Sequence, residues 1–135
     1  MAEPVYTSPE VVAKPLGPYS HLSRSGDLVY VAGQVGFRPD GTLAGDDIAS
    51  QSRQTFANIG ALLESQGGSL RSVLKFTTYL VSVDDIEGFY AVRNEIFPDL
   101  YPDGEYPPNT LLVVQRLVKP ELLVEIEAVA QVGAA

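Results

Sequence analysis

Two carboxylates stand inside an otherwise apolar run near the end of the sequence, Leu122-Leu-Val-Glu-Ile-Glu-Ala-Val-Ala130. Alternate side chains of a β-strand point to opposite faces, so a strand here places Glu125 and Glu127 on one face and Val124 and Ile126 on the other. Carboxylates enter such runs only where their surroundings stabilise them or use them. The pattern therefore fits either a strand with a wet polar face or a site where a carboxylate moves protons or positions water.

The other residue types limit which chemistry is available. Cysteine is absent and histidine occurs once, as His21, which we expect at a surface or hairpin position. Thiolate nucleophiles, disulfides and cysteine-ligated zinc are therefore excluded, and a histidine-based zinc site or a Ser-His-acid triad is not expected. No phosphate- or dinucleotide-binding glycine motif is present. We expect neither a metal nor an organic cofactor, and water is the expected nucleophile.

The charge balance limits the partners. The chain carries 17 acidic and 9 basic residues, a formal net charge of −8. A polyanion is repelled by such a protein, so nucleic acid is not expected as a partner. No apolar run approaches the roughly 20 residues that cross a bilayer, and no basic segment followed by an apolar one opens the chain. These features predict a cytoplasmic protein without a membrane span, acting on a small molecule.

The N-terminal third predicts an arm followed by a hairpin. At 135 residues the chain is expected to form one domain, residues 1–135, whose first 15 residues form an extended arm. Residues 20–24 and 28–35 have strand character and flank Ser25-Gly26-Asp27, which suits a tight turn. A second turn is expected at Pro39-Asp40-Gly41.

A first helix is predicted over residues 46–66. Apolar residues recur there at helical spacing, among them Phe56 and Ile59. Asp46 and Asp47 precede this stripe and suit the positive end of a helix. Gly67, with a second glycine after it, suits the left-handed residue that often follows a helix.

A second helix is predicted from Asp84, with Asp84 as its N-cap and Glu87 three residues later in capping-box spacing. Its apolar stripe ends at Phe97, and Pro98 is expected to stop it. The stretch from Pro98 to Pro108 is rich in Pro, Gly and Asp and is expected to form a loop.

The remaining segments predict strands. Residues 73–83 are rich in β-branched and aromatic residues and indicate one long strand. Residues 110–117 and 122–132 are expected to form a closing pair of strands. The order ββ-α-β-α-ββ predicts an α+β sandwich, a mixed sheet with two helices on one face. Apolar residues on both faces of the strands suggest that oligomerisation covers the other face.

Five motifs, in order, resemble the Rid family of YjgF-like proteins. They are GPYS at 17–20, VAGQV at 31–35, QTFANI at 54–59, VLKFTTYLV at 73–81 and VEIEAVA at 124–130. The resemblance runs from about residue 17 to residue 132. It implies a chorismate-mutase-like fold and a homotrimer whose strands form a central barrel with three clefts between subunits. It also implies hydrolysis of reactive 2-imino or 2-enamino acids to 2-keto acids and ammonia.

The resemblance assigns site residues one by one. It places a substrate-contacting tyrosine at Tyr19, a backbone contact at Gly33 and a water-positioning glutamate at Glu125. The family arginine that clamps the substrate carboxylate falls on Asn109, which has no charge. A charge-assisted hydrogen bond is worth about 1.5–3 kcal/mol and a neutral one roughly 1, so this departure weakens the grip on an anion. The chain thus resembles a Rid subgroup that lacks the arginine.

Two further residues are candidates at this site. Thr110 is a hydroxyl donor beside Asn109, and Arg93 is a possible substitute cation if its helix borders the cleft. The leading interpretation is a hydrolase or deaminase that adds water to an imine or enamine in inter-subunit clefts. Two alternatives share the same residues. One is a non-catalytic trimer that binds a small molecule or a protein partner, and the other is an enzyme of a specialised pathway acting on a neutral substrate.

Overall fold

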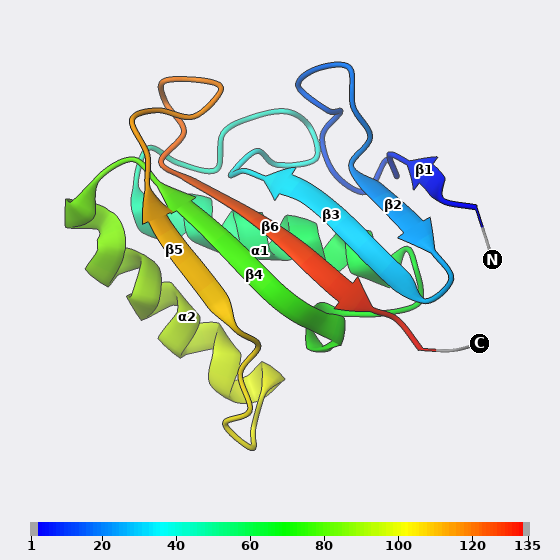
Figure 1. Ribbon diagram of the computed structural model, residues 1–135. Helices are drawn as coiled ribbons and strands as arrows, with labels where there is room; N and C mark the ends of the chain where they lie inside the picture. The colour runs from blue at the N-terminus through cyan, green and yellow to red at the C-terminus, as the bar shows by residue number, and fades with distance from the viewer. Residues whose placement is uncertain (1–2, 134–135) are drawn as a thin grey trace.

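The computed structural model describes residues 3–133, which form one six-stranded mixed sheet with two α-helices against one face (Figure 1). The strand order across the sheet is β1-β2-β3-β6-β4-β5. The strands are β1 (Val5–Thr7), β2 (Leu22–Ser25), β3 (Leu28–Gln34), β4 (Val73–Leu80), β5 (Asn109–Val113) and β6 (Val124–Gln131). The helices are α1 (Ile48–Glu64) and α2 (Ile86–Leu100), with short 3-10 turns η1 (Leu70–Ser72) and η2 (Val83–Asp85). The predicted α+β fold class is confirmed.

The predicted hairpin is confirmed. β2 and β3 pair antiparallel, with Ser25 opposite Leu28, and Gly26 in the turn has a φ of +62°, a conformation that glycine adopts without strain. Within the first 15 residues, β1 pairs antiparallel with β2 and forms one edge of the sheet.

The first helix lies where the sequence predicts it but is two residues shorter at each end than the predicted range 46–66. Asp47 is the N-cap of α1, and its carboxylate accepts a hydrogen bond of 2.9 Å from the backbone N–H of Ser50. Gly67, just beyond the helix, has a φ of +82°. The backbone N–H of Gly68 donates to the carbonyl of Leu63, which satisfies one of the last carbonyls of the helix.

The second helix corrects two predictions. Asp84 is not its N-cap. Ser82 caps η2 by accepting from the backbone N–H of Asp84, and α2 starts only after Asp85. Pro98 does not stop the helix, because it lies in the last turn, where its missing N–H removes a single hydrogen bond. The turn still closes through the backbone N–H of Tyr101, which donates to the carbonyl of Phe97.

The two C-terminal strands also differ from the prediction, because β5 and β6 do not pair with each other. β5 pairs parallel with β4, a connection that requires a crossover, and α2 supplies it. β6 inserts between β3 and β4, antiparallel to both. The reason lies in burial, since Val124 and Ile126 are fully buried and only a central strand offers them the helix layer.

The hydrophobic core lies between the sheet and the helices. Phe56 of α1 packs against Phe76 of β4 and against Phe89 and Phe97 of α2, with ring centroids 5.5–6.0 Å apart. The predicted faces of β6 are confirmed, because Val124, Ile126 and Ala128 are buried on the helix side while Glu125 and Glu127 alternate with them and are only partly buried. Within residues 3–133 no helix is long and apolar enough to cross a membrane.

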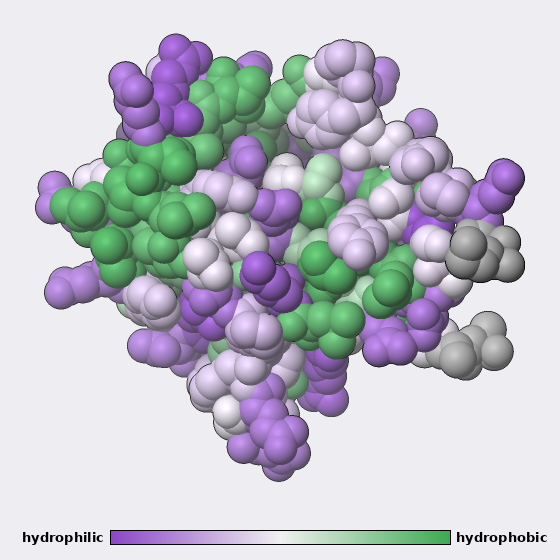
Figure 2. Space-filling model, viewed as in Figure 1, coloured by the Kyte–Doolittle hydropathy of each residue, from purple (hydrophilic) through white to green (hydrophobic). Residues whose placement is uncertain are grey.

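The opposite face of the sheet carries no helix layer in this chain and is amphipathic. Tyr30, Leu74 and Leu112 are each about half exposed. Figure 2 shows apolar patches separated by polar side chains on this side of the molecule. The prediction of apolar residues on both strand faces therefore holds only in part, since this face of β6 carries Glu125 and Glu127.

Candidate functional site

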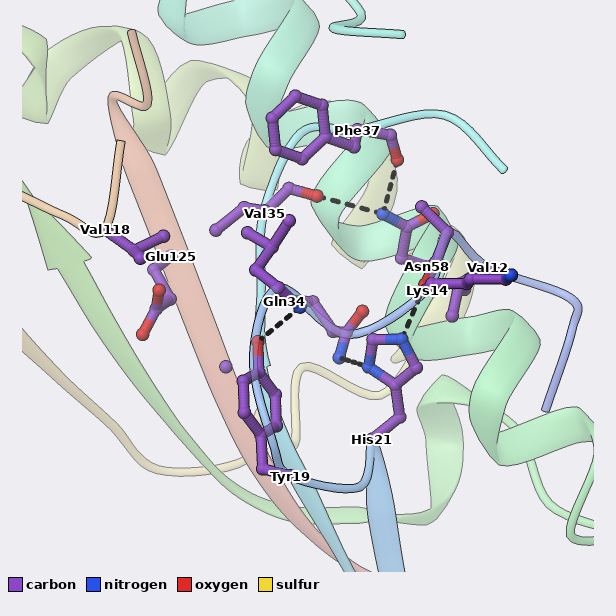
Figure 3. A pocket seen from close by; sticks show the side chains of 13 residues that line it. Val12, Lys14, Tyr19, His21, Gln34, Val35, Phe37, Asn58, Val118 and Glu125 are labelled. Carbon is purple, nitrogen blue, oxygen red and sulfur yellow. Dashed lines mark hydrogen bonds between the residues drawn. The ribbon is translucent and has the colours of Figure 1, made fainter. Parts of the chain in front are cut away.

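A cavity of about 250 Å³ opens where β3 ends and β6 begins (Figure 3). Three chain segments wall it with apolar side chains: Val12 and Leu16 before β2, Val35 and Phe37 after β3, and Val118 before β6. Tyr19, Gly33 and Glu125 line the same cavity, so the structure brings together three of the predicted site residues. Among residues 3–133, no group of three or more His, Asp or Glu side chains is placed to hold a metal ion.

A β-bulge brings the backbone of Gly33 against Glu125. The register between β3 and β6 shifts between Val31, which is opposite Ala128, and Gln34, which is opposite Ile126. A Cβ atom on residue 33 would lie 2.6 Å from Cδ and 2.8 Å from Cγ of Glu125, closer than such atoms approach. The glycine is therefore required at this position for the Glu125 side chain to lie where it does.

The surroundings of Glu125 make its carboxyl group a weaker acid than an exposed glutamate. Burial raises the pKa of the Glu125 carboxyl, and the neighbouring negative charge of Glu127 raises it further. The carboxyl group of Glu125 makes no hydrogen bond or ion pair with any of the residues that the structure describes. A carboxylate with a raised pKa and free lone pairs, facing a cavity, has the properties of a general base or an acceptor that holds water.

Glu127, on the same face of β6, is engaged differently. The hydroxyl of Tyr79 on β4 donates a hydrogen bond to Oε1 of Glu127. This bond to the carboxylate, with burial, raises the pKa of Tyr79 to about 12. Glu127 lies outside the cavity lining, so the two carboxylates of the strand have distinct surroundings.

His21 is buried and not at the surface, and its ring forms hydrogen bonds to two of the segments that line the cavity. Its Nε2 lies 2.6 Å from the carbonyl oxygen of Ala13, and its Nδ1 lies 3.1 Å from Nε2 of Gln34. Because the carbonyl can only accept and the amide nitrogen can only donate, Nε2 carries the proton and Nδ1 accepts. These two hydrogen bonds of His21 connect the segment before β2 to the end of β3 (Figure 3).

Asn58 of α1 holds the other side of the cavity. Its Nδ2 donates to the carbonyl oxygens of Val35 and Phe37, both at 2.9 Å. Sequence reasoning did not single out Asn58, Gln34 or a buried His21. The available signal was that Gln34 and Asn58 lie within VAGQV and QTFANI, two of the motifs that carry the family resemblance.

Tyr19 forms part of the rim of the cavity. Its hydroxyl accepts a hydrogen bond of 3.2 Å from the backbone N–H of Leu16, and 47% of the residue is exposed. The hydroxyl can still donate to a ligand, because a phenol both accepts and donates.

The other three predicted site residues do not line this cavity. Asn109 begins β5 opposite Phe76 on the helix side of the sheet, and its Oδ1 accepts a hydrogen bond of 2.8 Å from the hydroxyl of Thr78. Thr110 alternates to the open face and is exposed. Arg93 lies on α2. Within this chain, therefore, these three residues lie outside the cavity that Glu125 lines.

Comparison with known proteins places the chain in a family. The family model described as endoribonuclease L-PSP matches residues 10–132. A RutC family protein of Pyrococcus horikoshii is 37% identical over 131 residues, which cover 96% of this chain and 98% of the relative.

Two solved structures show the same fold. RidA from the Antarctic bacterium Psychrobacter sp. is 32% identical, with a TM-score of 0.82 over 95% of this chain and 99% of that one. TdcF of E. coli with bound serine is 25% identical, with a TM-score of 0.86 over 96% and 99%. The chain belongs to the Rid family, the YjgF-like proteins to which the endoribonuclease L-PSP model applies.

Proposed function

We propose that this protein hydrolyses a reactive imine or enamine to the corresponding carbonyl compound and ammonia. The observation that carries the proposal is the Glu125 carboxylate, which faces a cavity with apolar walls, has a raised pKa and has no partner among the described residues. Membership of the Rid family supports this class of reaction. The net charge of −8 and a carboxylate in the cavity oppose binding of RNA, despite the word endoribonuclease in the description of the family.

The proposed reaction adds water to a C=N bond. Glu125 accepts a proton from water while the water oxygen bonds to the imine carbon, and the C=N electron pair moves to nitrogen, which takes up that proton. The resulting carbinolamine then loses its hydroxyl proton through Glu125 to nitrogen, the C–N bond breaks, and ammonia leaves. Gly33 keeps room for the carboxylate beside the backbone, and Tyr19 offers a hydroxyl donor at the rim.

The polar end of the substrate determines which imine is accepted. Lys14 is the one side chain with a permanent positive charge among the described residues that line the cavity, and it is exposed. Asn109 and Thr110, which we propose as further substrate contacts, reach such a cavity only from a second subunit. We therefore propose a homotrimer with clefts between subunits, whose mass in light scattering is three times 14.5 kDa. A stable monomer at micromolar concentration contradicts this assembly.

One relative favours a second candidate function. A protein of Lactococcus lactis named putative regulator AldR is 32% identical over 87% of this chain. A cavity that binds a small molecule without turnover would suit such a role. The deciding assay measures ammonia release from imino acids generated in situ by an amino-acid oxidase, with semicarbazide trapping of the surviving imine. Faster ammonia release with the protein supports hydrolysis, and an unchanged rate supports the binding role.

Gly33→Ala tests the close approach between the bulge and Glu125. The added methyl group occupies the position of the Glu125 carboxyl, so the carboxyl must move while the backbone stays in place. A displacement of this kind lowers kcat by roughly ten- to hundredfold. Gly60→Ala is the matched control, because its Cβ meets only Leu70 at 3.5 Å, an ordinary contact on α1. Equal activity of both variants contradicts the role of Gly33.

A further inference from the structure

Arg93 differs from every other arginine of the chain. The sequence contains six arginines, and among residues 3–133 only the guanidinium group of Arg93 makes no hydrogen bond or ion pair. Arg53 forms an ion pair with Glu95, at 2.9 Å. The other four, Arg24, Arg38, Arg71 and Arg116, donate to backbone carbonyls. The donors of Arg93 are therefore unused in this structure.

The sequence of α2 explains why Arg93 lacks an acidic partner. Side chains three and four residues away are its neighbours on the helix, and these are Phe89, Tyr90, Ile96 and Phe97. The guanidinium carbon lies 4.5 Å from the ring centroid of Phe97 and 5.5 Å from that of Tyr90. The rings hold the cation by cation–π attraction but offer little for its N–H groups.

A small cavity opens at this cation. It has a volume of about 180 Å³ and is lined by Tyr90, Arg93, Asn94, Phe97, Pro98 and Tyr106. Figure 1 shows that the loop joining the end of α2 to the start of β5 turns back beside the C-terminal end of α2. Tyr106 of this loop lies with its ring centroid 6.1 Å from that of Phe97. Burial lowers the pKa of Arg93, yet a guanidinium this basic remains charged at neutral pH. The cavity thus combines a half-buried, unpaired cation with apolar planar walls.

We propose that this cavity is a second ligand site, which binds an organic carboxylate attached to a planar apolar group. The planar fork of Arg93 matches the two oxygens of a carboxylate, and partial burial strengthens that pair. The rings of Phe97 and Tyr106 provide a surface for the apolar part of the ligand. The site shares no lining residue with the cavity at Glu125, so it does not depend on the proposed hydrolysis.

Calorimetric titration of the whole protein with phenylacetate tests the site, with phenylacetamide as the neutral analogue of the same shape. We expect phenylacetate to bind and Arg93→Gln to raise its Kd at least about tenfold, because the charged fork is lost. The matched control is Arg71→Gln, whose guanidinium is occupied by the carbonyl of Asp99 and which should bind like the wild type. Glu125→Gln should also leave this Kd unchanged, which separates the site from the first cavity.

Several results would overturn the proposal. They are the absence of phenylacetate binding at millimolar concentration, equal binding of the acid and the amide, and an unchanged Kd in Arg93→Gln. Displacement of phenylacetate by inorganic phosphate at equal affinity would indicate a general anion site and overturn the carboxylate assignment. If circular dichroism shows that Arg93→Gln is unfolded, Arg93→Lys replaces it. That variant keeps the charge without the fork, and unchanged binding by it would contradict two-pronged recognition.

Discussion

Glu125→Gln is expected to lower kcat/KM for imine hydrolysis by at least about a hundredfold. The glutamine amide has nearly the shape of the carboxyl but cannot accept the proton of the attacking water. Because the Glu125 carboxyl group has no hydrogen-bond partner among the described residues, the substitution breaks no hydrogen bond that holds the fold. Ammonia release measures the loss, and light scattering checks that the assembly is unchanged.

Glu127→Gln is the matched control on the same face of β6. Its carboxylate accepts from Tyr79 and lies outside the cavity, so we expect less than about a tenfold loss of rate. Removing its charge also lowers the pKa of Glu125, because Glu127 contributes to raising it. The acid limb of the pH–rate profile should therefore move to lower pH. A larger loss of rate in Glu127→Gln than in Glu125→Gln would reverse the two assignments.

The stability of Glu125→Gln gives an independent readout of burial. Because burial raises the folded-state pKa of Glu125 above its ordinary value of 4.5, the folded protein binds more protons than the unfolded chain between the two pKa values. Wild-type stability therefore falls as pH rises through that window. The variant does not lose stability in this window, so its melting temperature should exceed that of the wild type at pH 7. The difference should vanish below the pKa that Glu125 has in the unfolded chain. A lower melting temperature at pH 7 would contradict an unpaired buried carboxylate.

Asn109→Arg is expected to raise kcat/KM on small anionic 2-imino acids by roughly ten- to hundredfold. The substitution supplies a charged fork for the substrate carboxylate, which Asn109 lacks. Asn109 is separated from Glu125 within one chain, so the gain requires the proposed cleft between subunits. A neutral imine should gain nothing, because a desolvated arginine without a carboxylate partner is unfavourable.

Asn109→Gln is the matched control, since it lengthens the side chain without adding charge. Both substitutions can break the hydrogen bond that Asn109 accepts from Thr78. A loss of activity shared by both variants therefore measures the effect of that contact alone. No gain in a folded, trimeric Asn109→Arg variant would favour the binding role over hydrolysis. A wild-type rate equal to that of relatives with the arginine would indicate that another cation, Lys14 of the cavity lining, already holds the carboxylate.

Local patterns predicted the elements but not all of their partners. The alternation around Glu125 gave the two faces of β6, and Asp47 and Gly26 marked a helix start and a turn through their own backbone preferences. The predictions that failed include one pairing between strands distant in the chain and one local helix end. β6 pairs with β3 and β4 because its apolar face needs the helix layer, and Pro98 stays helical because the last turn tolerates a missing N–H.

The site residues likewise fall into those that the sequence predicted and those that it did not. Tyr19, Gly33 and Glu125 followed from motifs that the chain shares with a family, and the structure gathers them around one cavity. His21, Gln34 and Asn58 were missed because their roles rest on hydrogen bonds between residues distant in the chain. Asn109 shows the limit of carrying over a family site. Its side chain does not line the cavity within this chain, and no local sequence pattern tells whether an oligomer brings it there.

The central place of β6 has a consequence for the speed of folding. Leu28 pairs with Gln131 and Val73 pairs with Ala130, so β6 joins a hairpin formed early in the chain to a strand formed in its middle. Until β6 inserts, β1-β2-β3 and β4-β5 have no common neighbour. Closing so long a loop costs chain entropy before its contacts form, which makes this topology slow to fold. Because Glu125 lies on the strand that joins the two parts of the sheet, the cavity can form only once β6 has inserted.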